Sequence, residues 1–519
     1  MADLLHELIY ESANACPEQE ALRYRGKSLD YSELASAVRR AAAGLLSAGL
    51  SRGERVAVYL EKRIETVEAL FGAAAAGGVF VPVNPILKPD QVAHILKDCN
   101  VRILVTSAER LALLSESLKT CHDLHTVMVV GDLPDPLAGL NLLSWNEAGE
   151  GVPHRAIGSD MAAILYTSGS TGRPKGVVLS HLNMLTGARS VASYLENTRE
   201  DRILSVLPLS FDYGLSQLTT AFQVGATAVL MNYLMPRDIV KMVEKEGITG
   251  LAAVPPLWIQ LADLEWGSDL RYFTNSGGAM PRATLDALRA RLPKAKPYLM
   301  YGLTEAFRST YLPPEEVDRR PESMGRAIPN AEIMVVREDG SPCVAGEPGE
   351  LVHRGPLVSM GYWNDPAKTA ERFKPAPDRE SGLPLPEIAV WSGDTVRTDE
   401  EGFLYFIGRR DEMIKTSGYR VSPTEVEEVI YSDETVSEAV ALGVPHPVQG
   451  QVIHVIICPR PGTEPNPEAL LELCRSHLPA FMVPSGISVR QGPLPRNPNG
   501  KIDRKLLAGE FAGGSQYSP

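Results

Sequence analysis

The segment from Thr167 to Lys175 is built from residue types that can hold a polyphosphate. It combines hydroxyl-bearing residues, glycines, a proline and cations in one short stretch, and an apolar strand-like run leads into it. Glycines let the backbone approach an anion and present successive N–H groups, hydroxyls donate further hydrogen bonds, and Lys175 adds positive charge. The residues that we expect to bind phosphate are Thr167, Ser168, Gly169, Ser170, Thr171, Gly172 and Lys175.

The spacing of this loop differs from that of the Walker A motif. The pattern G-x-x-x-x-G-K-[ST], typical of P-loop nucleoside triphosphatases, does not occur here. A flexible surface loop rich in serine and glycine has a similar composition. The loop alone therefore leaves both interpretations open, and the motifs that accompany it decide between them.

Six further motifs follow the loop along the chain. They are Ser276-Gly-Gly-Ala, Tyr301-Gly-Leu-Thr-Glu305, Trp391-Ser-Gly-Asp394, Gly408-Arg-Arg-Asp411, the segment from Lys415 to Glu427, and Asn499-Gly-Lys501. With the loop, they resemble in order the motifs of the acyl-adenylate-forming (AMP-dependent synthetase/ligase) superfamily, which includes acyl-CoA synthetases, aryl-CoA ligases, peptide-synthetase adenylation domains and luciferases. The resemblance covers nearly the whole chain. It implies that a carboxylic acid attacks the α-phosphate of ATP to give an acyl-adenylate and pyrophosphate, and that a thiol then displaces AMP.

The resemblance assigns nucleotide-binding roles to the central motifs. Glu305 matches the family's magnesium ligand, as suits a small hard cation that prefers oxygen, and Thr304 would contact phosphate. Tyr301 would stack on adenine. The backbones of Gly277, Gly278 and Gly302 would lie along the nucleotide.

Two residues are expected to hold the ribose. Asp394 matches the family aspartate that accepts both ribose hydroxyls, since a carboxylate offers two acceptor oxygens. Arg409 matches an arginine that reaches the ribose or phosphate. An ordinary turn aspartate, an exposed hairpin arginine and, for Tyr301, a core tyrosine remain the alternatives.

The C-terminal motifs imply a catalytic lysine on a domain that rotates. Lys501 would bridge the substrate carboxylate and the α-phosphate and neutralise charge as the adenylate forms. Asp411 lies where the family has its hinge, although an ordinary turn residue remains an alternative. After rotation, Lys415 and Gly418 would line the tunnel for the thiol. The expected division is an N-terminal domain, residues 1–410, that binds ATP and the acid, and a mobile C-terminal domain, residues 411–519.

The choice of acid is the least determined property. Phe211, Asp212, Tyr213 and Gly325 are expected to form the acyl pocket. The pair Phe211-Asp212 resembles an element of amino-acid adenylation domains in which the aspartate pairs with the substrate ammonium. A buried carboxylate needs a partner, which favours a small or amino-acid-like acid. Asp212 could instead bond neighbouring backbone or Tyr213.

A finer resemblance points to one branch of the superfamily. The segments Arg55–Thr66 and Val79–Pro85 are similar to AMP-forming acyl-CoA ligases associated with the bacterial exosortase A system. This resemblance fixes no substrate. The acceptor thiol can belong to coenzyme A or to the phosphopantetheine arm of an acyl carrier protein.

The elements that must position these residues alternate between strand and helix. Strands are predicted at 55–60, 79–83, 101–106, 203–207, 250–254 and 297–301, and helices at 65–77, 91–98, 238–246 and 281–292. This alternation is typical of parallel sheets covered by helices. Short strands between turns predict a small antiparallel, barrel-like unit at about 331–408, followed by a compact α/β unit. We therefore expect an α/β fold with a large N-terminal domain and a small C-terminal one.

Composition excludes several classes of protein. The 519 residues carry 51 basic and 64 acidic side chains, for a net charge of −13, which argues against general binding of nucleic acid. The six cysteines are scattered and form no zinc or disulfide pattern. No signal peptide or membrane-spanning run is evident, so a cytoplasmic enzyme is expected, of undetermined oligomeric state.

Two other functions use part of the same chemistry. An ADP-forming phosphotransferase would need the loop and magnesium but would leave Asp394, Asp411 and Lys501 unexplained together. An inactive nucleotide-binding regulator would be expected to lose Glu305 or Lys501, and both are present.

Overall fold

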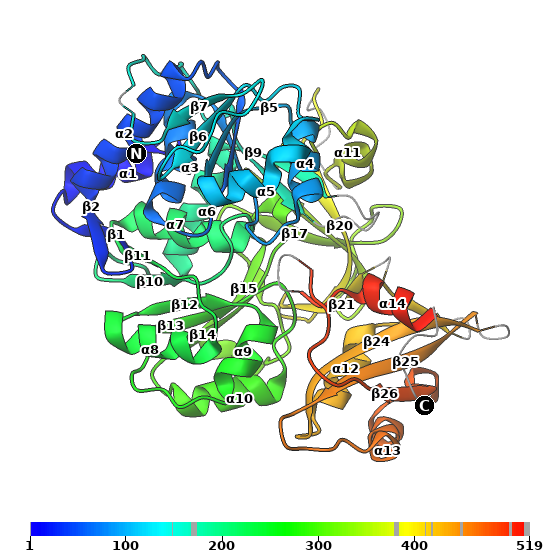
Figure 1. Ribbon diagram of the computed structural model, residues 1–519. Coiled ribbons are helices and arrows are strands. Elements are labelled where there is room, and N and C mark those ends of the chain that lie inside the picture. The colour runs from blue at the N-terminus through cyan, green and yellow to red at the C-terminus, as the bar shows by residue number, and fades with distance from the viewer. Residues whose placement is uncertain are drawn as a thin grey trace.

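The structure is a computed structural model that describes residues 2–147, 149–167, 174–377, 384–409, 412–416, 419–446, 450–497 and 501–512. Within these ranges the strands form four sheets, three of them in the N-terminal part of the chain and one in the C-terminal part (Figure 1). This α/β architecture confirms the predicted fold class. Every cysteine is a free thiol, and no helix of the described residues is long and apolar enough to cross a bilayer.

The first large sheet has the order β7-β6-β5-β3-β4-β8-β9. All of its pairings are parallel except the last, the hairpin of β8 and β9. Its apolar strands are buried on both faces, as expected for a parallel sheet covered by helices. The strands are β3 (Arg55–Tyr59), β4 (Val79–Pro82), β5 (Val101–Ser107), β6 (Thr126–Val130), β7 (Asn141–Ser144), β8 (Met161–Thr167) and β9 (Lys175–Ser180).

The second large sheet has the order β16-β15-β14-β13-β12-β10-β11-β1-β2, with a parallel centre and antiparallel edges. Its strands are β1 (Glu20–Tyr24), β2 (Lys27–Asp30), β10 (Arg202–Ser205), β11 (Thr227–Leu230), β12 (Gly250–Ala253), β13 (Tyr272–Asn275), β14 (Lys296–Tyr301), β15 (Thr310–Leu312) and β16 (Arg326–Ala327). The two large sheets share one continuous apolar core, into which the helices between them also pack.

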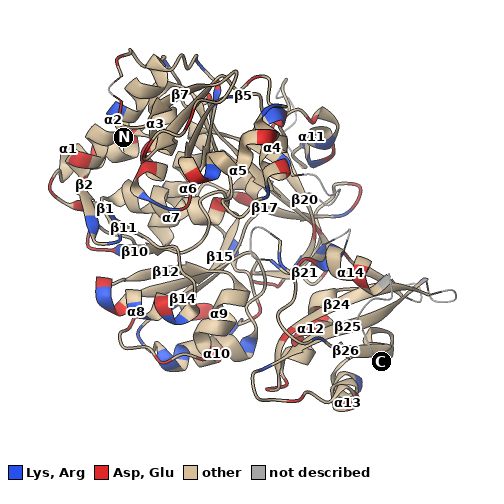
Figure 2. Ribbon diagram, viewed as in Figure 1, with Lys and Arg blue, Asp and Glu red and all other residues tan. Residues whose placement is uncertain are grey.

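The helices of the N-terminal part cover both large sheets. α1 (Glu7–Ala15), α2 (Tyr31–Ser47), α3 (Ile64–Ala76), α6 (His181–Tyr194) and α7 (Asp212–Val224) contribute to the shared core. α4 (Pro89–Asp98) and α5 (Ala108–Leu118) pack on the first sheet in a separate cluster. α8 (Pro236–Glu246), α9 (Pro255–Ala262) and α10 (Arg282–Arg291) pack on the second sheet. Figure 2 shows both signs of charge on α4 and α8.

A third, antiparallel sheet follows. It consists of β17 (Glu332–Val336), β18 (Gly349–Arg354), β19 (Phe373–Pro375), β20 (Ile388–Thr398) and β21 (Leu404–Arg409), in the order β17-β18-β20-β19 with β21 also paired to β20. The antiparallel character agrees with the sequence. Among the described strands the order is open, with no pairing that closes a barrel. α11 (Pro366–Arg372) and the short 3-10 turns η1 (Thr304–Ala306) and η2 (Pro314–Glu316) complete this part.

The C-terminal part has its own sheet and core. β22 (Ile414–Thr416), β23 (Tyr419–Val421), β24 (Val436–His446), β25 (Gly450–Pro459) and β26 (Gly486–Val489) are accompanied by α12 (Pro423–Tyr431), α13 (Pro467–His477), η3 (Ala480–Met482) and α14 (Arg504–Ala512). These elements enclose two apolar clusters separate from the large core. In Figure 1 this orange-to-red unit lies beside α9 and α10, and Arg460 Nη1 meets Asp263 Oδ1 across that side at 3.2 Å.

Candidate active site

The candidate site lies where four parallel strands of the second sheet end. Phe211 follows β10, Val254 follows β12, Ser276 follows β13, and Tyr301 is the last residue of β14. These strands run side by side in parallel, so their carboxyl ends meet along one edge. Open α/β sheets bind ligands at that edge. The fold therefore brings together motifs that are about 90 residues apart in the sequence.

The Lys501 side chain reaches this edge of the sheet at Gly277. The φ of Gly277 is +83°, a left-handed conformation that glycine adopts without strain. A Cβ at Gly277 would lie 3.3 Å from Lys501 Cε, 3.3 Å from Val254 Cγ1 and 3.9 Å from Phe211 Cζ. Glycine thus leaves room for the lysine, and the C-terminal unit delivers its side chain to the strand ends.

The charge of Lys501 is surrounded by groups of both signs. Burial lowers the pKa of Lys501, and the Arg409 cation lowers it further, whereas the carboxylates of Asp212, Asp394 and Glu412 raise it. The backbone is anchored locally, because the Lys501 N–H donates to Asn497 Oδ1 at 3.1 Å. The ammonium therefore lies within electrostatic reach of residues from both parts of the chain.

Asp212 has a partner within the protein. Arg308 Nη1 donates to Asp212 Oδ2 at 2.9 Å, and Thr304 Oγ1 donates to Asp212 Oδ1 at 3.2 Å. The Asp212–Arg308 pair is buried. The sequence interpretation needed a substrate ammonium because a buried carboxylate needs a cation, and Arg308 supplies that cation. Neither neighbouring backbone nor Tyr213 takes this role, so the reason for expecting an amino-acid-like acid is removed.

Glu305 is held by a residue that the sequence analysis did not single out. Tyr362 Oη donates to Glu305 Oε1 at 2.6 Å, and the Lys175 ammonium lies 5.4 Å from the centre of the Tyr362 ring. Burial, and then the Glu305 charge, raise the pKa of Tyr362, so the phenol remains a donor. One tyrosine therefore contacts both the proposed metal ligand and the cation at the end of the phosphate loop.

The backbone around Tyr362 is joined to the strand that leaves the loop. The Val178 N–H donates to Gly361 O at 3.0 Å, the Met360 N–H to Val178 O at 2.8 Å, and the Trp363 N–H to Gly176 O at 2.7 Å. The segment from Met360 to Trp363 thus lies along β9. Thr167 and Lys175 face each other at the end of the β8–β9 hairpin, so they mark the two sides of the predicted loop.

Tyr301, Asp394 and Arg409 contact one another in the structure. Tyr301 Oη donates to Asp394 Oδ2 at 2.5 Å, and Arg409 Nε lies 3.3 Å from Asp394 Oδ1. Asp394 is only 3% exposed, and burial raises its pKa. Asp394 lies in β20 opposite Arg409 at the end of β21. The hairpin of these two strands therefore fixes the carboxylate beside the proposed adenine-binding tyrosine.

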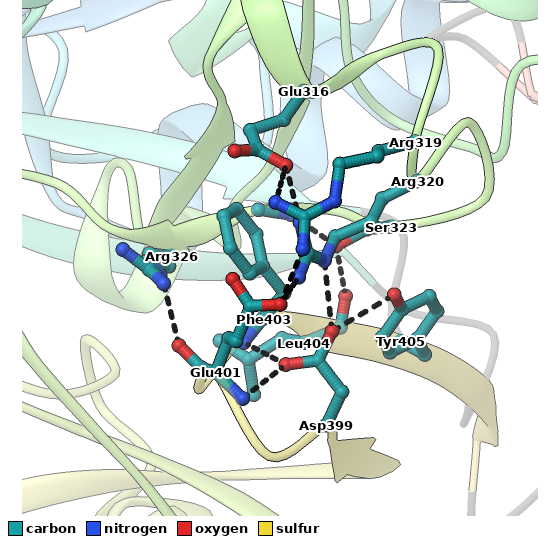
Figure 3. A network of polar contacts seen from close by, with 11 residues as sticks. Glu316, Arg319, Arg320, Ser323, Arg326, Asp399, Glu401, Phe403, Leu404 and Tyr405 are labelled. Atoms are coloured by element: carbon teal, nitrogen blue, oxygen red, sulfur yellow. Dashed lines mark hydrogen bonds and ion pairs between the residues drawn. The ribbon is translucent and has the colours of Figure 1, made fainter.

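A cluster of charged residues braces that hairpin from outside the site. Arg320, which is buried, contacts the carboxylates of Glu316, Asp399 and Glu401, and its guanidinium lies 4.1 Å from the centre of the Phe403 ring (Figure 3). Asp399 and Phe403 belong to the turn that joins β20 to β21. The cluster connects this turn to the segment after β15, which itself pairs with β14. It therefore holds the Asp394 strand against the Tyr301 strand.

The glycines predicted to belong to the site occupy their positions for different structural reasons. Gly302 lies against the Arg308 backbone, where a Cβ would come within 3.3 Å of Arg308 Cα. Gly278 O accepts a hydrogen bond from Asn275 Nδ2 at 3.0 Å. Gly325 has a φ of +86°, and a Cβ there would lie 1.8 Å from Tyr311 O. Close backbone packing explains Gly325, and its role in the acyl pocket stays a prediction.

Several predicted residues lie outside the described ranges. These are Ser168, Gly169, Ser170, Thr171, Gly172, Asp411 and Gly418. Lys415 belongs to β22. The predicted phosphate contacts of the loop, the hinge and the thiol tunnel therefore stay predictions.

Sequence reasoning missed two residues of this site. Tyr362 lies in a Gly-Tyr-Trp stretch far from the phosphate loop, and a tyrosine there has many ordinary explanations. Arg308 follows the Thr304-Glu305 pair so closely that its position could have flagged it. Asp212 offered the other signal, since its buried carboxylate required a cation.

Comparison with known proteins agrees with this geometry. The sequence model of the AMP-binding enzyme family matches residues 9–363, and that of the AMP-binding enzyme C-terminal domain matches residues 425–501. The chain belongs to the AMP-binding enzyme family. The match covers more than half of the chain and includes Tyr301, Thr304 and Glu305.

Relatives of the chain include a carrier-protein ligase and a CoA ligase. The chain is 33% identical over 506 residues to L-proline--[L-prolyl-carrier protein] ligase of Streptomyces coelicolor, covering 92% of this chain and 91% of the relative. It is 28% identical over 548 residues to long-chain-fatty-acid--CoA ligase of Salmonella typhimurium, covering 98% and 95%. It spans only 8% of the length of tyrocidine synthase 3 of Brevibacillus parabrevis, at 30% identity over 516 residues.

A solved structure has the same arrangement. The o-succinylbenzoate CoA synthetase of Bacillus subtilis in complex with its acyl-adenylate intermediate has a TM-score of 0.82 and 26% sequence identity, covering 96% of this chain and 97% of that one. The same synthetase has been solved with ATP and a magnesium ion. The finer resemblance to exosortase-associated ligases stays a prediction.

Proposed function

We propose that this AMP-binding enzyme is an AMP-forming acid–thiol ligase, in the first instance an acyl-CoA synthetase. It activates a carboxylic acid with ATP to an acyl-adenylate and pyrophosphate, and then transfers the acyl group to a thiol. One observation carries the proposal: Lys501 lies against Gly277, at the strand edge where Thr304, Tyr301 and Asp394 also gather. A cation so placed suits the transfer of a nucleotidyl group to a carboxylate.

The residues at the strand edge would each bind a different part of the nucleotide. Asp394 would accept the ribose hydroxyls, with Tyr301 against the adenine and Arg409 beside the ribose or phosphate. Asp394 already accepts a hydrogen bond from Tyr301 and pairs with Arg409, so its orientation is fixed before the nucleotide binds. Lys175 and the hairpin loop before it would hold the phosphates.

A magnesium ion fits the donors present. Among the described residues, no group of three or more His, Cys, Asp or Glu side chains could hold a metal ion by itself. Mg²⁺ commonly binds proteins through one or two carboxylates together with substrate phosphates. Glu305, oriented by Tyr362, would be that carboxylate. When bound, the ion would neutralise charge on the phosphates.

The adenylation step needs positioning and charge neutralisation more than proton transfer. The acid enters as a carboxylate, which is already a nucleophile. Its attack on the α-phosphate gathers negative charge on the phosphate oxygens. The Lys501 ammonium would contact both the attacking carboxylate and that phosphate. The Thr304 hydroxyl would turn from Asp212 to donate to phosphate. Lys501 and Thr304 are thus the proposed catalytic residues, with Glu305 as the metal ligand.

The second step requires Lys501 to withdraw and a thiol to enter. We assign this to rotation of residues 411–519 relative to residues 1–410 about Asp411, which would bring the β22–β23 hairpin with Lys415 and Gly418 to the site. The Arg460–Asp263 contact joins the two parts at 3.2 Å through exposed side chains. Exposed ion pairs contribute little, so this contact would not prevent rotation.

The acceptor is coenzyme A or the phosphopantetheine arm of an acyl carrier protein. Two relatives of the chain, a CoA ligase and a carrier-protein ligase, support both choices. They do not separate the acceptors, because the chain covers 95% of the CoA ligase and 91% of the carrier-protein ligase, so both thiols are tested. Amino acids are disfavoured as substrates, since Arg308 already pairs with Asp212.

The decisive assay is acid-dependent ATP–pyrophosphate exchange over a panel of fatty, aryl and amino acids. The proposal expects exchange with at least one acid, release of AMP with pyrophosphate, and a thioester when coenzyme A or a carrier protein is added. Release of ADP with phosphate would support a phosphotransferase. Absence of exchange with every acid would support an inactive nucleotide-binding protein.

A further inference from the structure

Arg308 is one of the largest fully buried side chains among the described residues, with 1% of its surface exposed. It follows Glu305 by three residues, and its guanidinium lies 4.6 Å from the centre of the Tyr213 ring. A buried guanidinium is stabilised only if its charge and its N–H groups find partners. The partners of the Arg308 guanidinium therefore indicate whether the protein alone satisfies it.

The backbone is strained where it turns Arg308 inward. Phe307 has φ +57° and ψ −53°, and the Arg308 N–H donates to Ala306 O at 2.6 Å. These values describe a γ-turn of the rare, strained form with positive φ at its centre. Phe307 is not a glycine, so the turn costs conformational energy. The turn places both the Phe307 ring and the Arg308 side chain in the interior.

Only one end of the guanidinium is used by the protein. Nη1 donates to Asp212 Oδ2 at 2.9 Å and to Phe307 O at 2.8 Å. Nε and Nη2 are buried without a hydrogen-bond partner among the described residues. Those two nitrogens form one edge of the planar fork, which is the edge that binds two oxygens side by side.

Another arginine of the same chain shows the contrast. Arg271 donates to both oxygens of Asp201, from Nε at 2.9 Å and from Nη2 at 2.7 Å, and Nη1 donates to Leu195 O at 2.8 Å. This pair uses all three nitrogens of the guanidinium. The fold can therefore complete an arginine–aspartate pair around the half-buried Arg271, and at the fully buried Arg308 it does not.

Arg308 is joined through Asp212 to residues assigned to the reaction. Asp212 joins Arg308 to Thr304 through its two carboxylate oxygens. Phe211, the residue before Asp212, lies beside Gly277 and Lys501. An acid whose carboxylate meets Lys501 would thus extend its tail past Phe211 toward Asp212 and Arg308.

We propose that the acid activated by this enzyme carries an oxygen acceptor in its tail, and that this oxygen binds Nε and Nη2 of Arg308. The inference rests on the proposed function and names its substrate class. Asp212 already neutralises the guanidinium, so a keto or amide oxygen is sufficient, and a second carboxylate also matches the fork. A plain alkyl chain would leave both donors buried and unpaired.

The test compares acids of equal carbon count in ATP–pyrophosphate exchange. At each short and medium chain length, the plain acid is set against its oxo and dicarboxylic partners, for example pentanoate against 4-oxopentanoate and pentanedioate. At the best length, an oxygenated acid should exceed the plain acid in kcat/KM by about 100-fold, the usual worth of a hydrogen bond to a charged donor. The better of the two oxygenated acids identifies a neutral or a charged acceptor.

Variants separate recognition from folding. In the double variant Arg308→Met with Asp212→Asn no charge is left unpaired, and the preference should fall to within about threefold. The double variant Arg271→Met with Asp201→Asn removes a comparable pair elsewhere and should keep the full preference. Thermal unfolding of both shows whether they fold. Arg308→Lys keeps the charge but lacks the fork, so it should lose most of the preference.

Two failures can be told apart. If a plain alkyl or aryl acid is the best substrate, or if the Arg308 variants rank the acids as the wild type does, the inference is wrong and the ligase function stands. If the wild type gives no exchange with any acid, the proposed function fails, and the inference with it.

Discussion

Replacing Tyr362 by phenylalanine removes one hydroxyl from the site and leaves the ring in place. The lost contact is the 2.6 Å bond to Glu305 Oε1, which is short, as expected for a hydroxyl donating to a carboxylate. Such a bond contributes about 1.5–3 kcal/mol when buried. Glu305 is only partly buried, so in the variant water can replace part of the lost hydrogen bond. The expected loss of stabilisation is therefore about 1.4 kcal/mol, which corresponds to a factor of about ten in affinity.

The effect should appear as a higher Mg²⁺ concentration required for activity. Without the phenol, Glu305 is free to rotate, and residues that orient a metal ligand typically contribute about 10–100-fold to metal affinity or activity. In pyrophosphate exchange titrated with Mg²⁺ at saturating ATP, the half-maximal Mg²⁺ concentration should rise about tenfold for Tyr362→Phe. The KM for ATP, measured at saturating Mg²⁺, should change little, because the ring still faces Lys175.

Two further variants complete the test. Tyr362→Leu also removes the ring beneath Lys175 and should raise the KM for ATP about threefold, the worth of a partly exposed cation–π contact. Tyr405→Phe is the matched control, because Tyr405 Oη donates to Asp399 Oδ2 at 3.1 Å in the cluster of Figure 3, away from the site. If Tyr362→Phe needs no more Mg²⁺ than Tyr405→Phe, Tyr362 does not position the metal ligand.

Two predictions concern stability. Lys62 Nζ donates to Val206 O at 2.7 Å, and burial lowers the pKa of Lys62 to about 7. Above pH 7 the folded state then binds fewer protons than the unfolded state. The free energy of unfolding of the wild type should therefore rise by about 2 kcal/mol between pH 7 and 9, relative to that of Lys62→Met. Parallel pH curves for the two proteins would refute this. Arg320→Met leaves three carboxylates without their shared cation, and it should lower the urea midpoint clearly more than Arg319→Met, the exposed neighbour; equal midpoints would show that the cluster does not brace the hairpin.

The fold could be predicted from the sequence to a large extent, because its elements are locally determined. The apolar runs of β3, β4 and β5 and the helices between them appear at the predicted places. The start of α7 at Asp212 was not predicted. The sequence analysis assigns Phe211, Asp212 and Tyr213 to the acyl pocket, and the buried polar residues of α7 hide the apolar periodicity of a helix.

The site was predictable as a set of motifs but not as a set of contacts. The sequence places Tyr301 and Asp394 in separate motifs, and only the fold shows that one donates to the other. The buried Asp212 carboxylate requires a cation, and the structure shows one within the chain. That cation, Arg308, is turned inward by the strained γ-turn at Phe307, and such a conformation leaves no sequence signal because the residue is not a glycine.

We propose that Lys501, carried by the C-terminal unit to the strand edge at Gly277, drives formation of the adenylate. The most direct measurement compares both half-reactions of Lys501→Ala with those of Lys505→Ala, an exposed lysine nearby. Lys501→Ala should lose about 100–1,000-fold in ATP–pyrophosphate exchange, while it still transfers the acyl group from a supplied acyl-adenylate to the thiol. Equal loss of both half-reactions, or exchange as fast as that of Lys505→Ala, would contradict this proposal.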